Sequence, residues 1–329
     1  MRVIRSLTGA AALCMATAML PLAPAAHAAD PYPNRPIRMV IGFPAGGPTD
    51  VNARMFAQGM AEQLGQPIVV DNKPGAGSNL ASTTVLSAPA DGYTILYNTS
   101  SLVLGAMLYS SAKFDPLKDF VPVVRTAGVP LVVAVSTTVP AKTFAEFVAL
   151  TKASPGKLNY ASSGAGTIDH LAAALLTTQL DIRMEHVPYK GTAPALVDLV
   201  SGNTQMFTTT QNTLLPFIHD KRLVPLAIAS LQRSPLMPEV PTVSEAAGLP
   251  GFEITAWNGI VVAAGTPPAV VSRLNAAVNA VLKQKDFVAR LRATGAEPYG
   301  GSAEAYGAYL KSETARWKTV VQQAGVTPQ

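Results

Sequence analysis

The chain has 329 residues, 14% of them charged, and a formal net charge of +5. Its Lys and Arg residues form no cluster, which argues against a nucleic-acid-binding protein, because such proteins need a concentrated basic face. The only cysteine is Cys14, so the rest of the chain has no disulfide, no thiol nucleophile and no cysteine metal ligand. The histidines lack metal-ligand spacing, and we expect no metal and no other cofactor.

The first 28 residues have the pattern of a secretory signal peptide. Arg2 and Arg5 precede an apolar run that ends near Leu22, and Ala26-His27-Ala28 has the small residues of a cleavage site. A membrane-spanning helix needs about 20 consecutive apolar residues, and this run is shorter and broken by prolines. An uncleaved anchor is the alternative. The pattern favours export to the periplasm with cleavage near Ala28.

Short apolar segments that alternate with helical segments predict an α/β protein with parallel sheets. In the first part, strands are expected at residues 37–43, 68–70 and 93–97, with helices at 49–64 and near Ser78. The pattern then restarts, with strands at 131–135, 158–161, 186–189, 205–208 and 226–230, and helices at 144–153, 167–180, up to Val200, 268–283, 286–292 and 303–323.

Two α/β units in one chain predict two doubly wound sheets, joined by a hinge, with a central cleft of the kind that binds small molecules. We assign residues 29–127 and 252–329 to a discontinuous first lobe, and residues 128–251 to the second. Residues 259–263 could pair with either sheet. Trp257 could line the cleft or pack in the core.

Two loops rich in Gly, Ser and Thr each connect a strand to a helix, at residues 43–50 and 162–167. A helix start leaves backbone N–H groups without partners and carries the positive end of the helix dipole, so it favours an anion. Thr49 and Thr167 are candidate N-caps that also offer hydroxyl groups. The simpler interpretation is that these glycines only close turns. The expected ligand contacts in these loops are Phe43, Ala45, Gly46, Gly47, Thr49, Ser162, Ser163, Gly164, Gly166 and Thr167.

Other motifs point away from nucleotide binding and catalysis. The Gly-x-Gly segments at residues 75–77 and 164–166 lack the third glycine of a dinucleotide fingerprint, and no phosphate-binding P-loop occurs. Ser162 and Ser163 precede His170, but no G-x-S-x-G elbow is present. We therefore expect His170 to be structural, Lys190 to lie at a rim, and the protein not to be an enzyme.

The order of motifs resembles the periplasmic substrate-binding proteins of tripartite tricarboxylate transporters, the Bug family. The resemblance runs from about residue 35 to the C-terminus and is carried by the segments at residues 43–50, 53–54, 72–77, 91–96, 155–160, 162–164, 187–191, 238–251, 257–259 and 265–267. It implies a type II periplasmic-binding fold that closes around a ligand. It also implies that backbone N–H groups, hydroxyls and waters hold the ligand carboxylate, with little part for arginine.

On this basis, further contacts are expected from Asn98, Thr99, Ser100 and Ser101 in the first lobe and from Tyr189, Lys190, Gly191, Thr208 and Thr209 in the second. At Thr208 the family pattern has an acidic residue. Its loss makes the pocket less negative, which disfavours ligands with a distal ammonium and favours a dicarboxylate or an aromatic carboxylate. The expected partners are this ligand and the membrane components of the transporter, and we expect a monomer.

Two alternatives remain open from the sequence. A protein of the same fold could present its ligand to a membrane sensor kinase instead of a transporter. A secreted serine hydrolase could use Ser162 or Ser163 together with His170.

Overall fold

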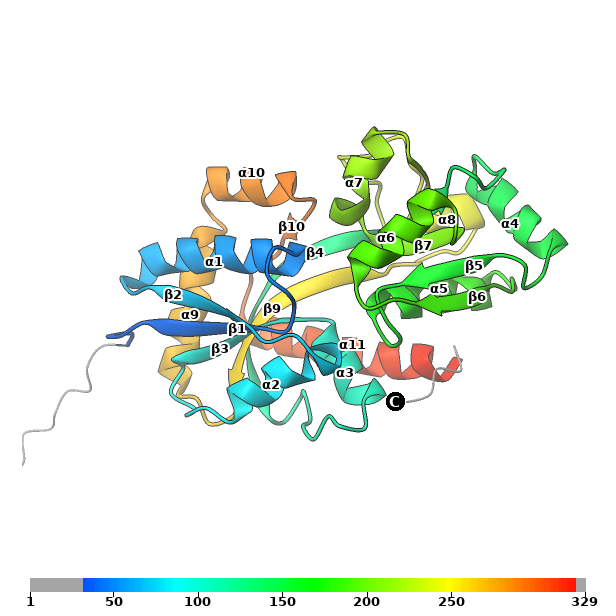
Figure 1. Cartoon of the computed structure of the whole chain (residues 1–329). Coiled ribbons are helices and arrows are strands. Elements are labelled where there is room, and N and C mark those ends of the chain that lie inside the picture. Colours follow the sequence, from blue (N-terminus) through cyan, green and yellow to red (C-terminus); the bar gives the residue numbers. More distant parts are fainter. Residues whose placement is uncertain (1–31, 324–329) are drawn as a thin grey trace, which may run out of the picture. The chain divides into compact units, whose positions relative to one another are not determined.

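The computed structural model describes residues 32–323 (Figure 1). The predicted signal peptide and its cleavage site near Ala28 lie outside the described residues. From Tyr32 onward the chain forms one compact unit. Within residues 32–323, no helix has the length and apolar character required to cross a membrane.

The first sheet is mixed rather than parallel throughout. It contains β2 (Ile68–Asn72), β1 (Ile37–Ile41), β3 (Thr94–Thr99), β9 (Thr255–Ala263) and β4 (Phe120–Ser136) in this spatial order, and the short β10 (Glu297–Pro298) also pairs with β4. β1 is parallel to β2 and β3, but β9 is antiparallel to β3 and β4. The prediction of parallel sheets is therefore wrong for β9, which returns alongside β4 without the crossover that parallel strands require.

The second sheet is also mixed. It is formed by the end of β4 with β7 (Met206–Thr210), β5 (Asn159–Ser162), β6 (Glu185–Pro188) and β8 (Leu223–Ile228). β5 is parallel to β6 and β7, whereas β4 is antiparallel to β7 and β8. The carboxyl ends of β5, β6 and β7 therefore lie at one edge of this sheet.

β4 belongs to both sheets. Its residues 120–130 pair with β9, and its residues 131–136 pair with β7 and β8 (Figure 1). The sequence predicted only residues 131–135, because Pro122 and Arg125 interrupt the apolar pattern where the pairing register shifts. Residues 259–263 belong to β9 and so to the first sheet. The proposed lobe boundaries fall within β4 and just before β9, and they stay a prediction.

Helices cover both faces of the first sheet. α1 (Pro48–Leu64), α9 (Pro268–Val281) and α10 (Lys285–Ala293) share one apolar cluster with alternate residues of β1, and α2 (Asn79–Leu86), α3 (Ser101–Leu108) and α11 (Ala303–Gln323) share another. Met39 lies in the first cluster and Val40 in the second, as the alternation of side chains along a strand requires. A short 3-10 turn (Ala76–Ser78) precedes α2.

The second sheet has the same arrangement. α6 (Thr192–Ser201) and α7 (Gln211–His219) contribute to the cluster on one face, α4 (Phe144–Ala153) and α5 (Ile168–Gln179) to that on the other, and the short α8 (Val243–Ala247) packs beside α4. The predicted α/β class with two doubly wound sheets is confirmed.

Helix α11 packs against β4, α3 and α5 and is fixed by a buried carboxylate. Glu313 accepts hydrogen bonds from the indole nitrogens of Trp257 (2.7 Å) and Trp317 (3.0 Å), and it pairs with Arg316 (3.0 Å). Both tryptophans are fully buried. Trp257 is therefore a packing residue that ties β9 to α11.

Candidate functional site

The loop between β5 and α5 has the backbone that its sequence predicts. Thr167 is the N-cap of α5: its Oγ1 accepts a hydrogen bond from His170 N (3.5 Å) and donates one to Gly164 O (2.7 Å). Gly164 (φ +149°) and Gly166 (φ +76°) adopt positive φ values that side chains disfavour. The glycines at these two positions are thus required by the loop conformation.

Most of the predicted contacts of the second lobe lie together around this loop. Tyr189 N donates to Ser162 O and Gly191 N donates to Ser163 O, both at 3.0 Å. Because Ala161 pairs with Phe207 in parallel, Thr208 follows at the same edge of the sheet. Thr208 is buried, and its Oγ1 has no hydrogen-bond partner among the described residues. Lys190 is exposed, as expected for a rim lysine.

Asp169, the second residue of α5, belongs to this group but was not among the predicted contacts. Ser163 Oγ donates to its Oδ2 at 2.5 Å, and the Thr209 hydroxyl also bonds to its carboxyl group. Burial raises the pKa of Asp169 to about 6, although these hydrogen bonds act in the opposite direction. The sequence signal that could have identified Asp169 is an acidic residue in the first helical turn after a Ser-Ser-Gly loop.

Two stacked histidines form hydrogen bonds with this loop. His170 Nδ1 accepts a hydrogen bond from Gly166 N (3.0 Å), and His186 Nε2 lies 2.7 Å from Ser162 Oγ. The two rings are parallel within 4°, with centroids 3.9 Å apart, and Tyr160 stacks on His186. Burial lowers the pKa of both histidines, that of His186 to about 4 with the help of His170. His170 is therefore neutral near pH 7 and structural.

This geometry contradicts the serine hydrolase alternative. Ser162 is fully buried and bonds to His186 rather than His170. Ser163 donates to Asp169 and so has no histidine base. A nucleophile must instead be exposed to substrate and bonded to its base.

The loop between β1 and α1 is held by a different network. Asp50 accepts hydrogen bonds from Gly46 N and Arg54 Nε, both at 2.9 Å, and from Asn72 Nδ2 at 3.0 Å. Asn72 Nδ2 also donates to Phe43 O at 2.9 Å. Burial acts to raise the pKa of Asp50. The hydrogen bonds from Arg54, Gly46 and Asn72, together with the charge of Arg54, outweigh this effect, so the pKa of Asp50 is lowered.

The N-cap of α1 is Gly47, so the prediction that Thr49 is the cap is wrong. Pro48 is the first helical residue, a position that proline favours because it has no N–H to leave unpaired. Ala45 and Gly46 are exposed, and Phe43, Gly47 and Thr49 are half-buried. The loop thus presents its backbone at the start of α1.

The polar segment at the end of β3 is more buried than the loops. Asn98 and Thr99 are the last residues of β3, and Ser101 is the first of α3. Asn98 Nδ2 donates to the Tyr306 hydroxyl (2.8 Å), whereas its buried Oδ1 has no partner among residues 32–323. Asn98, Thr99 and Ser100 are less than 10% exposed.

The loop at residues 162–167 contacts α3, which covers one face of the first sheet. A Cβ atom at Gly166 would lie 2.9 Å from Leu108 Cδ1, at the end of α3. In addition, Gln211 Nε2 donates to Gly295 O at 2.6 Å. Whether the two loops hold one ligand between them stays a prediction.

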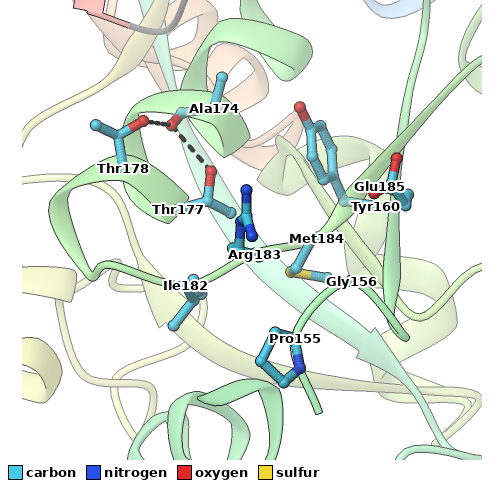
Figure 2. Close-up of a pocket in the computed structure, with 10 residues that line it drawn as sticks. All are labelled: Pro155, Gly156, Tyr160, Ala174, Thr177, Thr178, Ile182, Arg183, Met184 and Glu185. Atoms are coloured by element: carbon cyan, nitrogen blue, oxygen red, sulfur yellow. Dashed lines mark hydrogen bonds between the residues drawn. The ribbon is translucent and has the colours of Figure 1, made fainter.

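A cavity of about 570 Å³ lies away from both loops, between the second half of α5 and the start of β6 (Figure 2). Its lining consists of Pro155, Gly156, Tyr160, Ala174, Thr177, Thr178, Ile182, Arg183, Met184 and Glu185. None of these residues is a predicted ligand contact. Among the described residues, no group of three or more His, Cys, Asp or Glu could hold a metal ion.

Two mixed sheets that share a long strand, each covered by helices on both faces, define a two-lobed periplasmic-binding fold of type II. The model of the tripartite tricarboxylate transporter family receptor matches residues 52–326. The chain therefore belongs to this family of solute-binding receptors, which includes the Bug proteins, and it is not an enzyme.

Relatives of this family are similar over most of the chain. BugT of Bordetella pertussis is 36% identical over 299 residues, which cover 90% of this chain and 91% of BugT. The structure of Rpa4515 of R. palustris with adipate has a TM-score of 0.84 and 34% identity, and the match covers 91% of this chain and 100% of that one. MatC from Rhodopseudomonas palustris with bound malate has a TM-score of 0.79 and 34% identity, covering 88% and 100%.

Proposed function

We propose that this protein captures a small carboxylate outside the cytoplasm and delivers it to the membrane components of a tripartite tricarboxylate transporter. A dicarboxylate or an aromatic carboxylate is the favoured ligand. Export to the periplasm, cleavage near Ala28 and a monomeric state are parts of the same proposal. The similarity to Rpa4515 with adipate and MatC with malate supports a carboxylate ligand.

The observation that carries the proposal is the loop at the start of α5. Its glycines have no side chains to block the start of α5, although Gly164 N and Gly166 N themselves donate to Ser162 Oγ and His170 Nδ1. Ser163 and Thr167 add hydroxyl groups beside the positive end of the helix dipole. The loop at the start of α1 offers a second such end. Charge-assisted hydrogen bonds of about 1.5–3 kcal/mol each would, in small number, give the roughly −8 kcal/mol of a micromolar ligand.

In this proposal the ligand contacts come from both lobes. Phe43, Ala45, Gly46, Gly47, Thr49 and the segment 98–101 act from the first. The loop 162–167, the segment 189–191 and Thr208 and Thr209 act from the second. Thr208 has a buried hydroxyl without a partner in the described part of the chain, which fits a position that a ligand or a water satisfies.

A thermal-shift screen tests the function. The panel contains succinate, malate, glutarate, adipate, benzoate and phthalate, with arginine, lysine and glutamine as the basic and zwitterionic comparison. We expect stabilisation by one or more of the mono- or dicarboxylates. Stabilisation by the amino acids alone would contradict the proposed ligand class.

A further inference from the structure

Asp169 is a buried carboxyl group that connects two of the proposed ligand contacts. It is 4% exposed, and its Oδ2 lies 2.5 Å from Ser163 Oγ. The Thr209 hydroxyl bonds to the same carboxyl group. The proposed function gives Ser163 and Thr209 a role toward the ligand, but it leaves Asp169 without one.

In the described part of the chain, no cation pairs with this carboxyl group. None of the ion pairs within residues 32–323 includes Asp169. α5 packs against β5, β7 and α11, and its His170 stacks on His186 of β6. The titratable groups on these elements include Tyr160 on β5, Glu185 and His186 on β6, and the ion pair of Glu313 and Arg316 on α11. On α5 itself, His170 is neutral near pH 7. The pKa of Asp169 responds to burial and to hydrogen bonds from Ser163 and Thr209.

The charge of Asp169 decides what its two hydroxyl neighbours offer a ligand. An ionised carboxylate only accepts hydrogen bonds, so Ser163 and Thr209 both donate to it and turn only lone pairs toward a ligand. A neutral carboxyl group donates to one of them, and that hydroxyl can then donate to a ligand carboxylate. A ligand carboxylate beside ionised Asp169 would also meet a second negative charge in a site that is poorly solvated.

We propose that Asp169 is a positioning residue that couples carboxylate binding to the uptake of one proton from solvent, which Asp169 holds in the complex. This inference rests on the proposed function, because it requires a carboxylate to bind at Ser163 and Thr209. The raised pKa of Asp169 supports it, since a group with a pKa of about 6 takes up a proton near neutral pH at little cost. A ligand with a hydroxyl or ammonium donor at this position binds without the proton.

Isothermal titration calorimetry with adipate and with malate tests the coupling. Titrations at pH 6, 7 and 8, in buffers with different ionisation enthalpies, give the affinity and the number of protons taken up. For the wild type we expect uptake of about one proton at pH 8, and an affinity that falls about tenfold per pH unit above the pKa of Asp169. Asp169→Asn keeps the shape and both hydrogen bonds, so it should bind with no proton uptake and a flat pH profile.

Asp220→Asn is the matched control, because Asp220 is exposed and lies just after α7. It should keep the proton uptake of the wild type. A second measurement needs no variant: the carboxyl ¹³C signal of Asp169 should titrate near pH 6 in the free protein and at higher pH with adipate or malate bound.

Each outcome has a definite meaning. If the wild type takes up no proton, or if Asp169→Asn takes up as many as the wild type, the coupling is wrong although the proposed function stands. If no carboxylate of the screening panel binds between pH 6 and 8, the proposed function fails, and the role of Asp169 fails with it.

Discussion

The two strand–helix loops contain carboxyl groups at similar positions but in opposite electrostatic settings. Asp50 and Asp169 both lie in the first turn of a helix and are 3% and 4% exposed. Arg54 pairs with Asp50, and the pKa of this group is lowered. Among residues 32–323, the partners of Asp169 are hydroxyl and backbone groups, and burial raises its pKa to about 6. Asp50 therefore stays ionised near neutral pH, whereas Asp169 changes its charge in this pH range.

Substitution of Gly166, which lies against Leu108 at the end of α3, should have the largest effect on binding. Gly166→Val should weaken carboxylate binding about 100-fold or more, because a positive φ costs a side chain about 1–3 kcal/mol and the new Cβ overlaps Leu108. Calorimetry with adipate or malate measures the loss.

Gly248→Val is the control for this variant. Gly248 also has a positive φ (+63°), but it follows α8, and a Cβ atom added there would have no neighbouring atom within 4 Å. It should lose stability without losing affinity. Equal affinity of the wild type and Gly166→Val would show that this loop is not a ligand contact.

Removing the charge of Asp169 should stabilise the free protein. Its pKa is higher in the folded state than in the unfolded state, so its contribution to stability is complete below about pH 4 and is lost as the pH rises through about 6. Asp169→Asn should therefore raise the free energy of unfolding by on the order of 2–3 kcal/mol at pH 7.5, and by much less at pH 4. Urea unfolding at both pH values checks this. A destabilised variant at pH 7.5 would contradict the role assigned to this carboxyl group.

Asp50 should respond in the opposite direction and by a smaller amount. Asp50→Asn loses the charge-assisted bonds from Arg54, but Arg54 is half exposed, so solvent screens the pair. We expect a loss of about 1 kcal/mol at pH 7. Because the pKa of Asp50 is lowered, its contribution is present above the unfolded pKa and is lost as the pH falls through the folded value. Urea unfolding of both proteins at pH 7 and pH 3 should show the difference shrink at the lower pH, and a larger difference at pH 3 would be inconsistent with this pairing.

Local signals made much of the fold predictable. The bounds of α4 follow from the pattern after Thr143, which forms a capping box with Glu146, and the bounds of α11 were also predicted correctly. The long β4 was mostly missed, because Pro122 and Pro130 do not look like residues of a central strand. α3 was missed because its residues are apolar on all sides and show no helical period.

In the candidate site, the sequence identified what the local chain determines and missed what folding brings together. Thr167 as an N-cap and the glycines of its loop could be read directly. The bond between Ser162 and His186 joins residues 24 positions apart, and that between Asp169 and Thr209 joins two different elements. Such contacts depend on the pairing of β5 with β6 and β7, which the linear pattern does not specify.

A crystal structure with the most stabilising carboxylate of the screening panel would show directly whether the two loops form the binding site. We predict one carboxylate group within hydrogen-bond distance of backbone N–H groups of the loop 162–167, and the rest of the ligand in contact with the loop 43–50. A ligand that binds only in the cavity of Figure 2, with both loops empty, would contradict the proposed site.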